Sequence, residues 1–184
     1  MVLFRAVQLS DAPRLAELRR PGASREVQHT LNAEGITEEL KSLTPVYPCL
    51  VAEVDGQVQA CAFAAPLRPE SAYQWDVELH LFVAEDMRRQ GLGSALLLRL
   101  MRVLSVQGFL HLCAAVSLPD DTALAFLDAC GFAQAGRLPG MAYHSGAWHD
   151  LLWLTRPLAE RPLYPAPPTP FASFEKEELA ALIL

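Results

Sequence analysis

Apolar and polar residues alternate most regularly in the middle of the chain, from Tyr73 to Val83. Alternation with a period of two is typical of a strand whose two faces differ. One predicted face holds Val77, Leu79, Leu81 and Val83, and the other holds Glu78, His80 and Phe82. A leucine-rich pattern with helical spacing follows from Gly93 to Val106, and Gly108 ends it. The segment Arg88–Ser94 therefore joins a strand to a helix through two glycines.

The same patterns predict the remaining elements. Further strands are predicted over Val2–Val7, Cys49–Val54, Gln57–Ala65, Leu110–Val116, Phe132–Leu138 and Leu151–Thr155. Further helices are predicted over Ala12–Arg20, Thr37–Leu43, Pro119–Cys130 and Glu175–Ile183. Asp55-Gly56 predicts a tight hairpin, Gly22–Gly35 a loop or short irregular helix, and Gly140–Trp148 a loop. The order β-α-α-β-β-β-α-β-α-β-β predicts a mixed sheet with helices on both faces, in the α/β or α+β class.

Length, composition and charge narrow the class of protein. A chain of 184 residues, 52% hydrophobic and 20% charged, is expected to form one globular domain with a sizeable core. A net charge of −6 argues against broad nucleic-acid binding. There is no run of about 18 apolar residues to span a membrane. The four cysteines have no C-x-x-C spacing, which predicts reduced, buried thiols. We therefore expect a soluble, cytoplasmic protein.

Proline becomes frequent after Pro157, and the sequence is expected to divide at that point. Residues 1–158 form the predicted domain, and residues 159–184 form a proline-rich extension that ends in the predicted terminal helix. Two roles are open for this extension. It either packs on a neighbouring subunit or covers its own domain.

The connection Arg88–Ser94 is the strongest candidate for chemistry. A strand that leads through glycines into a helix directs backbone N–H groups at one point, with the positive end of the helix dipole behind them. Such a point suits an anion as large as a pyrophosphate. A dinucleotide-binding fingerprint needs a third glycine where this chain has Leu96, and a P-loop needs Gly-Lys-Ser/Thr, which is missing. An ordinary strand–turn–helix connection, with glycines for geometry alone, is the alternative.

The pattern Arg-Arg-x-Gly-x-Gly after a valine-rich strand resembles motif A of the Gcn5-related N-acetyltransferases (GNAT). Its flanks resemble the phosphinothricin/methionine sulfoximine acetyltransferase branch of that family. Matching residues before the loop are Phe63, Pro66, Leu67-Arg68-Pro69, Tyr73, Val77-Glu78 and Phe82-Val83. Those after it are Cys130-Gly131-Phe132, Gly136-Arg137-Leu138, Tyr143, Gly146, Trp148 and Asp150. The resemblance spans about Phe4 to Leu158 and implies a mixed, mostly antiparallel sheet flanked by helices.

The resemblance implies acetyl-CoA as cosubstrate and a primary amine of a small molecule, such as an amino acid or an analogue, as acceptor. The CoA pyrophosphate would bind to backbone N–H groups of Arg88, Arg89, Gln90, Gly91, Leu92, Gly93 and Ser94. Leu81, Phe82 and Val83 would pair with the pantetheine arm, with the Val83 N–H on the thioester carbonyl. Asp120 takes a further cofactor-contacting position. No metal is implied, and a homodimer is.

The resemblance also implies roles for residues at the acceptor. Glu78 matches the general base of the branch, which would deprotonate the substrate ammonium through water. A solvated strand carboxylate is the alternative for this residue. His80 shares its face and is a second catalytic candidate, with a structural histidine as the alternative. The implied substrate-binding residues, for which packing or a solvated loop position is the alternative, are Arg68, Tyr73 and Trp75.

The chain departs from the family at the later helix. The family usually has Asn followed three residues on by Ser, where this chain has Asp120 and Ala123. One turn later, Leu127 stands where a Tyr or His commonly protonates the leaving thiolate. A CoA thiolate still leaves without such an acid, because the reference thiol pKa is about 8.5. Besides an N-acetyltransferase that acts on small amines, two alternatives are therefore open. One is a catalytically weak acyl-CoA-binding module, and the other is a protein or peptide N-acetyltransferase.

Overall fold

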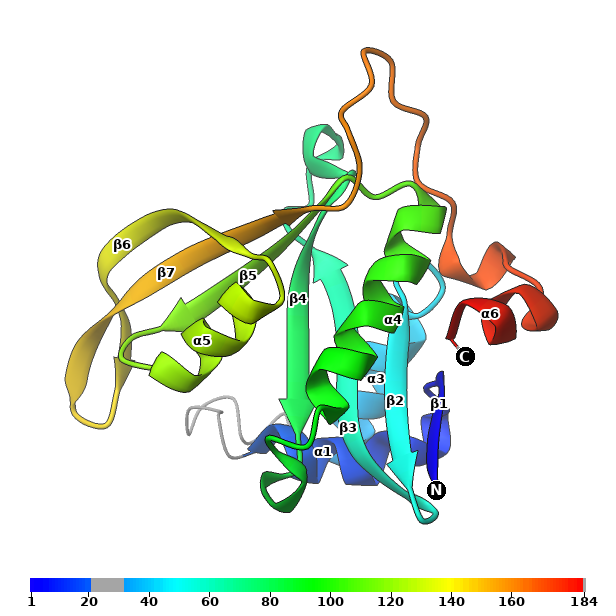
Figure 1. Ribbon diagram of the computed structural model, residues 1–184, viewed down its shortest axis with the longest axis horizontal. Helices are drawn as coiled ribbons and strands as arrows, with labels where there is room; N and C mark the ends of the chain where they lie inside the picture. Colours follow the sequence, from blue (N-terminus) through cyan, green and yellow to red (C-terminus); the bar gives the residue numbers. More distant parts are fainter. Residues whose placement is uncertain (21–31, 184) are drawn as a thin grey trace.

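The computed structural model describes residues 1–20 and 32–183, which form one seven-stranded sheet with helices on both faces (Figure 1). The strand order is β1-β2-β3-β4-β5-β7-β6, and only the β4–β5 pair is parallel. The strands are β1 (Val2–Ala6), β2 (Cys49–Val54), β3 (Gln57–Pro66), β4 (Asp76–Val83), β5 (His111–Ser117), β6 (Ala133–His144) and β7 (Ala147–Pro157). The helices are α1 (Ala12–Arg19), α3 (Ala33–Leu43), α4 (Leu92–Gln107), α5 (Asp121–Ala129) and α6 (Lys176–Ile183). The predicted element order and mixed sheet are confirmed.

Each face of the sheet has its own hydrophobic core. On the face covered by α4 and α5, the helical leucines Leu96, Leu97, Leu100 and Leu104 have no exposed surface. On the other face, α1 and α3 contribute Leu15, Ile36 and Leu40. Burying each leucine side chain contributes about 1.5–3 kcal/mol. The two cores explain why β4 alternates, because Val77 and Leu79 face the α4 core while Phe82 packs against the α1–α3 core.

Three boundaries differ from the prediction. The segment Gly140–Trp148 was predicted as a loop, and this is wrong, because β6 and β7 continue to a two-residue turn at Ser145 and Gly146. Both turn residues have positive φ (52° and 80°), which is the geometry of a type I′ hairpin. The strand predicted from Tyr73 begins only at Asp76, since Ser71–Tyr73 form a 3₁₀ turn.

The second predicted helix also begins earlier than expected. It starts at Ala33 rather than Thr37, because the Asn32 side chain caps it by accepting the Gly35 N–H at 2.7 Å. Gly35 is therefore helical, and residues 22–31 of the segment Gly22–Gly35, predicted as a loop or short irregular helix, lie outside the described residues. The tight hairpin at Asp55-Gly56 is confirmed.

The C-terminal segment, residues 159–183, folds back onto its own domain. Figure 1 shows it rising from the end of β7, turning, and descending to α6 beside α4 and β1. Phe171 and Ile183 are buried in the α4 core, and Leu179 and Leu182 pack against it. Of the two roles open for the extension, this structure has the second. Within the described residues, no helix is both long and apolar enough to cross a bilayer.

Candidate active site

The parallel strands β4 and β5 form a fork. Their ladder has only three pairs, Asp76–His111, Val77–Leu112 and Glu78–Cys113. Both strands continue beyond it, β4 to Val83 and β5 to Ser117, and Figure 1 shows them separating from the top of the sheet downward. In the described part of the chain, no strand pairs with β4 on this side after Glu78.

The register of β4 decides which of its backbone groups face the fork. Asp76 accepts the Leu67 N–H (3.4 Å) and the Ala84 N–H donates to Gln59 (2.8 Å), both on the β3 side. Hydrogen-bonding direction alternates along an antiparallel strand, so the N–H and C=O groups of the even-numbered residues of β4 bond to β3. The odd-numbered residues turn theirs toward β5. Beyond the ladder, Leu81 and Val83 therefore direct their N–H groups into the fork.

The loop Arg88–Ser94 lies at the open end of the fork and leads into α4. Arg89 and Gly91 have positive φ (62° and 79°), so the loop turns sharply just before the helix. Ala95 is the first residue to bond within the helix, to the Gly91 carbonyl at 3.0 Å, and no side chain of the described residues caps the turn. The N–H groups of Leu92, Gly93 and Ser94 are thus left without helical partners and point out at its positive end.

Two contacts tie this loop to the strand. The Arg88 Nε donates to the Val83 carbonyl at 3.3 Å. A Cβ on Gly93 would lie 3.4 Å from Val83 Cγ2 and 3.6 Å from Leu81 Cδ2, so the first turn of α4 packs directly on these side chains. The predicted cofactor residues of β4 and of the loop are therefore brought together. Free N–H groups line both the strand edge and the helix terminus.

Glu78 is half-buried at the point where the fork opens. Its carboxylate has no hydrogen-bond or ion-pair partner among the described residues. Burial raises the pKa of Glu78 above its ordinary value. A carboxylate with a raised pKa and free lone pairs is a stronger base than an ordinary glutamate, which suits it to accept a proton.

His80 lies one residue further along the same face, in an aromatic cluster. Its ring stacks on Phe63, with 4.7 Å between centroids, and Phe63 also stacks on Phe82. The Arg19 guanidinium lies over the Phe63 and Phe82 rings and forms an ion pair with Glu39 at 2.6 Å. Burial, assisted by the charge of Arg19, lowers the pKa of His80 and so favours the neutral form of its ring. No local pattern indicates that Arg19 reaches this face, since its contact with Phe82 spans more than 60 positions.

Comparison with known proteins places this geometry in a family. A family model described as an acetyltransferase (GNAT) domain matches residues 4–153. The chain belongs to the GNAT acetyltransferase family. It is 37% identical over 133 residues to a phosphinothricin N-acetyltransferase of Streptomyces viridochromogenes, covering 72% of this chain and 70% of that protein. It is 30% identical over 109 residues to an L-methionine sulfoximine/L-methionine sulfone acetyltransferase of Pseudomonas aeruginosa, covering 59% and 63%.

A solved GNAT structure shares the whole fold. The phosphinothricin acetyltransferase of Sinorhizobium meliloti, solved in complex with acetyl-CoA, superposes with a TM-score of 0.82 at 23% identity, covering 94% of this chain and 99% of that one. The predicted GNAT family and the acetyltransferase class are confirmed by the family model and the curated relatives. The predicted mixed sheet is confirmed by the superposition.

The departures from the GNAT pattern have structural explanations. Asp120 caps α5, its Oδ1 accepting the Ala123 N–H at 2.9 Å, and a carboxylate fulfils this role because the cap needs only an acceptor. Leu127 is 4% exposed and belongs to the α4 core. An acid placed there would have to displace core packing. The cofactor contact predicted for Asp120 stays a prediction.

The predicted substrate-binding residues lie near the closed end of the fork. The Arg68 guanidinium is 5.5 Å from the centroid of the Tyr73 ring and 3.9 Å from a Glu70 oxygen, so these two predicted residues are together. Trp75 instead donates its indole N–H to the Ala166 carbonyl at 2.8 Å. Its ring therefore holds the C-terminal segment. Substrate binding by all three stays a prediction.

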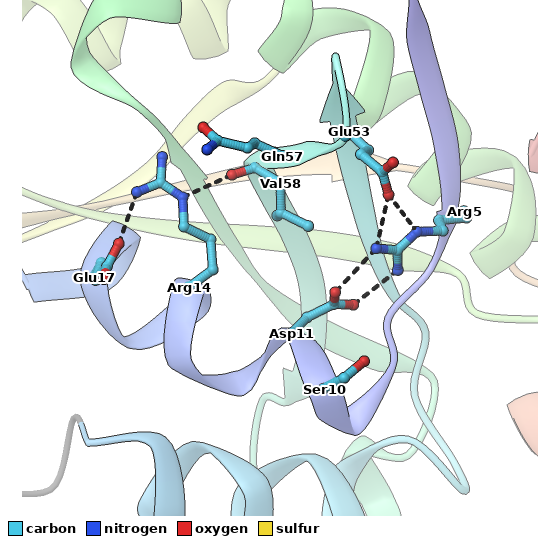
Figure 2. Close-up of a pocket in the computed structure, with 9 residues that line it drawn as sticks. Arg5, Ser10, Asp11, Arg14, Glu17, Glu53, Gln57 and Val58 are labelled. Carbon is cyan, nitrogen blue, oxygen red and sulfur yellow. Dashed lines mark hydrogen bonds and ion pairs between the residues drawn. The ribbon is translucent and has the colours of Figure 1, made fainter.

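A polar hollow of about 330 Å³ lies elsewhere, between β1, α1 and the β2–β3 hairpin (Figure 2). Its charged groups are already paired with one another. Arg5 bridges Asp11 (2.8 Å) and Glu53 (3.0 Å), and Arg14 pairs with Glu17 (2.8 Å). Its described lining includes none of the predicted site residues. The hollow is a salt-bridge network that ties β1 and β2 to the start of α1.

Proposed function

We propose that this protein transfers the acetyl group of acetyl-CoA to the primary amine of a small molecule, such as an amino acid or an amino-acid analogue. One observation carries the proposal. Glu78, a carboxylate with a raised pKa and no partner among the described residues, lies where β4 and β5 begin to separate. Beyond this point the fork is lined by free backbone N–H groups. The names of the curated relatives, which acetylate phosphinothricin and methionine sulfoximine, support an acceptor of this kind.

Each part of the site has one task in this mechanism. The N–H groups of Leu92, Gly93 and Ser94 bind the pyrophosphate of CoA. The Leu81 backbone pairs with the pantetheine arm. The Val83 N–H donates to the thioester carbonyl and stabilises the oxyanion that forms on it. A donor of this type contributes about 3–4 kcal/mol in a site from which water is excluded.

Proton transfer completes the reaction. Glu78 accepts a proton from the substrate ammonium through water, which frees the nitrogen lone pair. The nitrogen attacks the thioester carbonyl carbon and a C–N bond forms. The attached nitrogen then releases its second proton to solvent, and the C–S bond breaks. The CoA thiolate leaves and takes a proton from solvent, since Leu127 provides no acid. His80, neutral and on the same face, is proposed to share the proton relay or orient the amine.

The second candidate function is a catalytically weak acyl-CoA-binding module. Leu127 and Asp120 favour it, since one removes the acid and the other adds a negative charge at a position where the family contacts an anionic ligand. A peptide or protein amine is the remaining alternative for the acceptor.

Thiol release from acetyl-CoA, followed with a panel of free amino acids, analogues and peptides, separates these functions. We expect at least one small amine to accelerate release, and Glu78→Gln to abolish the acceleration. Glu17→Gln, a matched substitution on the exposed face of α1, is expected to leave it unchanged. If acetyl-CoA binds but no amine accelerates release, the binding-module function is correct. Acceleration by peptides alone would identify a peptide N-acetyltransferase.

We further propose a homodimer. Several large apolar side chains are exposed on the β6–β7 hairpin, and β6 is a free sheet edge. They are Leu138, Met141, Tyr143 and Trp148. Light scattering after gel filtration is expected to give twice the chain mass, and Trp148→Ser is expected to shift the protein toward monomer. A wild-type monomer at all concentrations would contradict the proposal.

The remaining proposals concern location and partners. A cytoplasmic location is supported by four unpaired cysteines, three of them buried. A lack of nucleic-acid binding is supported by the net charge of −6. Residues 1–158 are proposed as the acetyltransferase domain and 159–184 as its extension.

A further inference from the structure

The C-terminal segment crosses the closed end of the fork. Just before it, the Leu158 N–H donates to the Leu110 carbonyl at 2.8 Å. Arg161 Nη2 then lies 3.5 Å from His111 Nδ1, and the Ala166 carbonyl accepts the Trp75 indole N–H at 2.8 Å. The segment thus contacts the start of β5 and the residue that precedes β4.

Those contacts fall on the residues that hold the two strands together. The Trp75 carbonyl accepts the Leu110 N–H at 2.8 Å and the His111 N–H at 3.5 Å. His111 Nδ1 also lies 3.3 Å from Asp76 Oδ1. The ladder that follows has three pairs and ends at Glu78. With so few bonds between the strands, the geometry of the closed end determines where Glu78 and the fork edge lie.

The far part of the segment is firmly anchored, so the Ala166 carbonyl is held on both sides. The Gln107 side chain, 2% exposed, donates to the carbonyls of Thr169 (2.8 Å) and Val46 (3.0 Å), and the Thr169 N–H returns a bond to Gln107 (2.7 Å). Phe171 and Ile183 are buried in the α4 core. The Gln107 Oε1 has no hydrogen-bond partner among the described residues, so the side chain anchors the segment through its amide nitrogen alone. Buried N–H groups are expensive to leave without acceptors, so the Gln107 Nε2 favours the docked segment.

We propose that the C-terminal segment is a clasp on the β4–β5 fork, and that Trp75 is the positioning residue through which it fixes Glu78. The proposal rests on the acetyltransferase function proposed above. The clasp sets the separation of the strand edges where the pantetheine arm would lie, and the placement of the base three residues after Trp75. Trp75 acts through the strand and does not touch the substrate.

The test is Trp75→Phe in the full-length chain, which removes the indole N–H and keeps an aromatic ring. Loss of this one neutral hydrogen bond is expected to lower kcat and to raise the acetyl-CoA Kd. The two changes multiplied together are expected to be about two- to tenfold. The KM of the amine is expected to stay constant, because the acceptor contacts are intact. Val58→Ala, a core substitution at the far end of β3, controls for lost stability and is expected to leave kcat unchanged below its unfolding temperature.

The outcomes separate the roles of Trp75. Unchanged kcat and Kd in Trp75→Phe would overturn the proposal, as would equal losses in Val58→Ala. A raised amine KM with unchanged kcat would make Trp75 a substrate contact instead. If Trp75→Phe does not fold, Arg161→Gln serves instead, because Arg161 makes the exposed contact with His111. This variant is also expected to lower kcat and raise the acetyl-CoA Kd, and no change in either would overturn the proposal. Failure of the wild-type protein to acetylate any amine would overturn the proposed function, while the acetyl-CoA Kd, measured by calorimetry, would still test the clasp.

Discussion

Gly91→Ala tests whether the shape of the loop, rather than its charge, creates the pyrophosphate site. Gly91 has φ +79° immediately before α4, and a Cβ at this position would meet no atom of the described residues within 4 Å. The substitution therefore adds no clash. Its only effect is to place an L-residue in the left-handed region, which costs about 1–2 kcal/mol.

That cost must show in one of two quantities. If the loop keeps its conformation without ligand, the free energy of unfolding falls. If the loop relaxes, acetyl-CoA must restore it and the Kd rises instead. The sum of the two changes is therefore expected to be about 1–2 kcal/mol, which corresponds to about 5- to 30-fold when all of it falls on binding.

Gly93→Ala provides the matched control, because it adds the same methyl group two positions later. Gly93 lies in the first turn of α4, where the new Cβ would meet Val83, Leu81 and Phe126 at 3.4–3.6 Å, which are ordinary contacts. Alanine is a better helix former, by up to about 1 kcal/mol. We expect no loss in the sum of stability and affinity, measured by urea unfolding and acetyl-CoA calorimetry. The reasoning is refuted if Gly91→Ala folds and binds like wild type, or if Gly93→Ala loses as much.

Three further predictions concern the acid–base and helix residues. Glu78→Gln is expected to lower kcat/KM by about 10²–10⁴-fold. Because burial raises the pKa of Glu78, the acid limb of the wild-type pH–rate profile should lie above the ordinary glutamate pKa. A profile that follows a normal glutamate would contradict this. The pKa of Glu78 is higher in the folded state than in the unfolded state. Its neutral carboxyl therefore stabilises the fold below the unfolded pKa, and this stabilisation is lost as pH rises through the folded pKa. Glu78→Gln is accordingly expected to raise Tm at neutral pH in a thermal melt. Asp120→Asn keeps the α5 cap and removes a charge, so acetyl-CoA should bind more tightly to this variant. Asp120→Ala removes the cap and should destabilise the protein by about 1 kcal/mol. Equal behaviour of the two variants in calorimetry and unfolding would argue against both effects. Leu127→Tyr should cost about 1–3 kcal/mol by overpacking the core and should not raise kcat, and a faster enzyme in the thiol-release assay would show that the site accepts an acid there.

Local patterns were sufficient to predict most of the fold. The alternation in β4 and the leucine spacing of α4 each report burial on one side, and the structure places those residues in the two cores as expected. The two strands of the β6–β7 hairpin were predicted, but their continuation across Gly140–Trp148 was missed because Gly140 and Gly146 interrupt the apolar pattern. The Ser145-Gly146 pair was the available signal, since this dipeptide favours a two-residue turn.

The site was less accessible to sequence reasoning, because its decisive features are long-range. The motif at Arg88–Ser94 indicates the helix terminus, but only the strand order shows that β4 and β5 separate after Glu78. Arg19 comes to Phe82 through the packing of α1 on the sheet, and Trp75 meets Ala166 across 91 positions. Spacing along the chain carries no information about either contact.

Mass spectrometry of the reaction products tests the central claim most directly. Wild-type protein and Glu78→Gln are each incubated with acetyl-CoA and an equimolar mixture of amino acids, amino-acid analogues and short peptides. The account predicts that wild type places one acetyl group on the amine of a free amino acid or analogue, and that Glu78→Gln binds acetyl-CoA but forms little of this product. Binding of acetyl-CoA by wild type without any acetylated amine, or equal product from the two proteins, would contradict it.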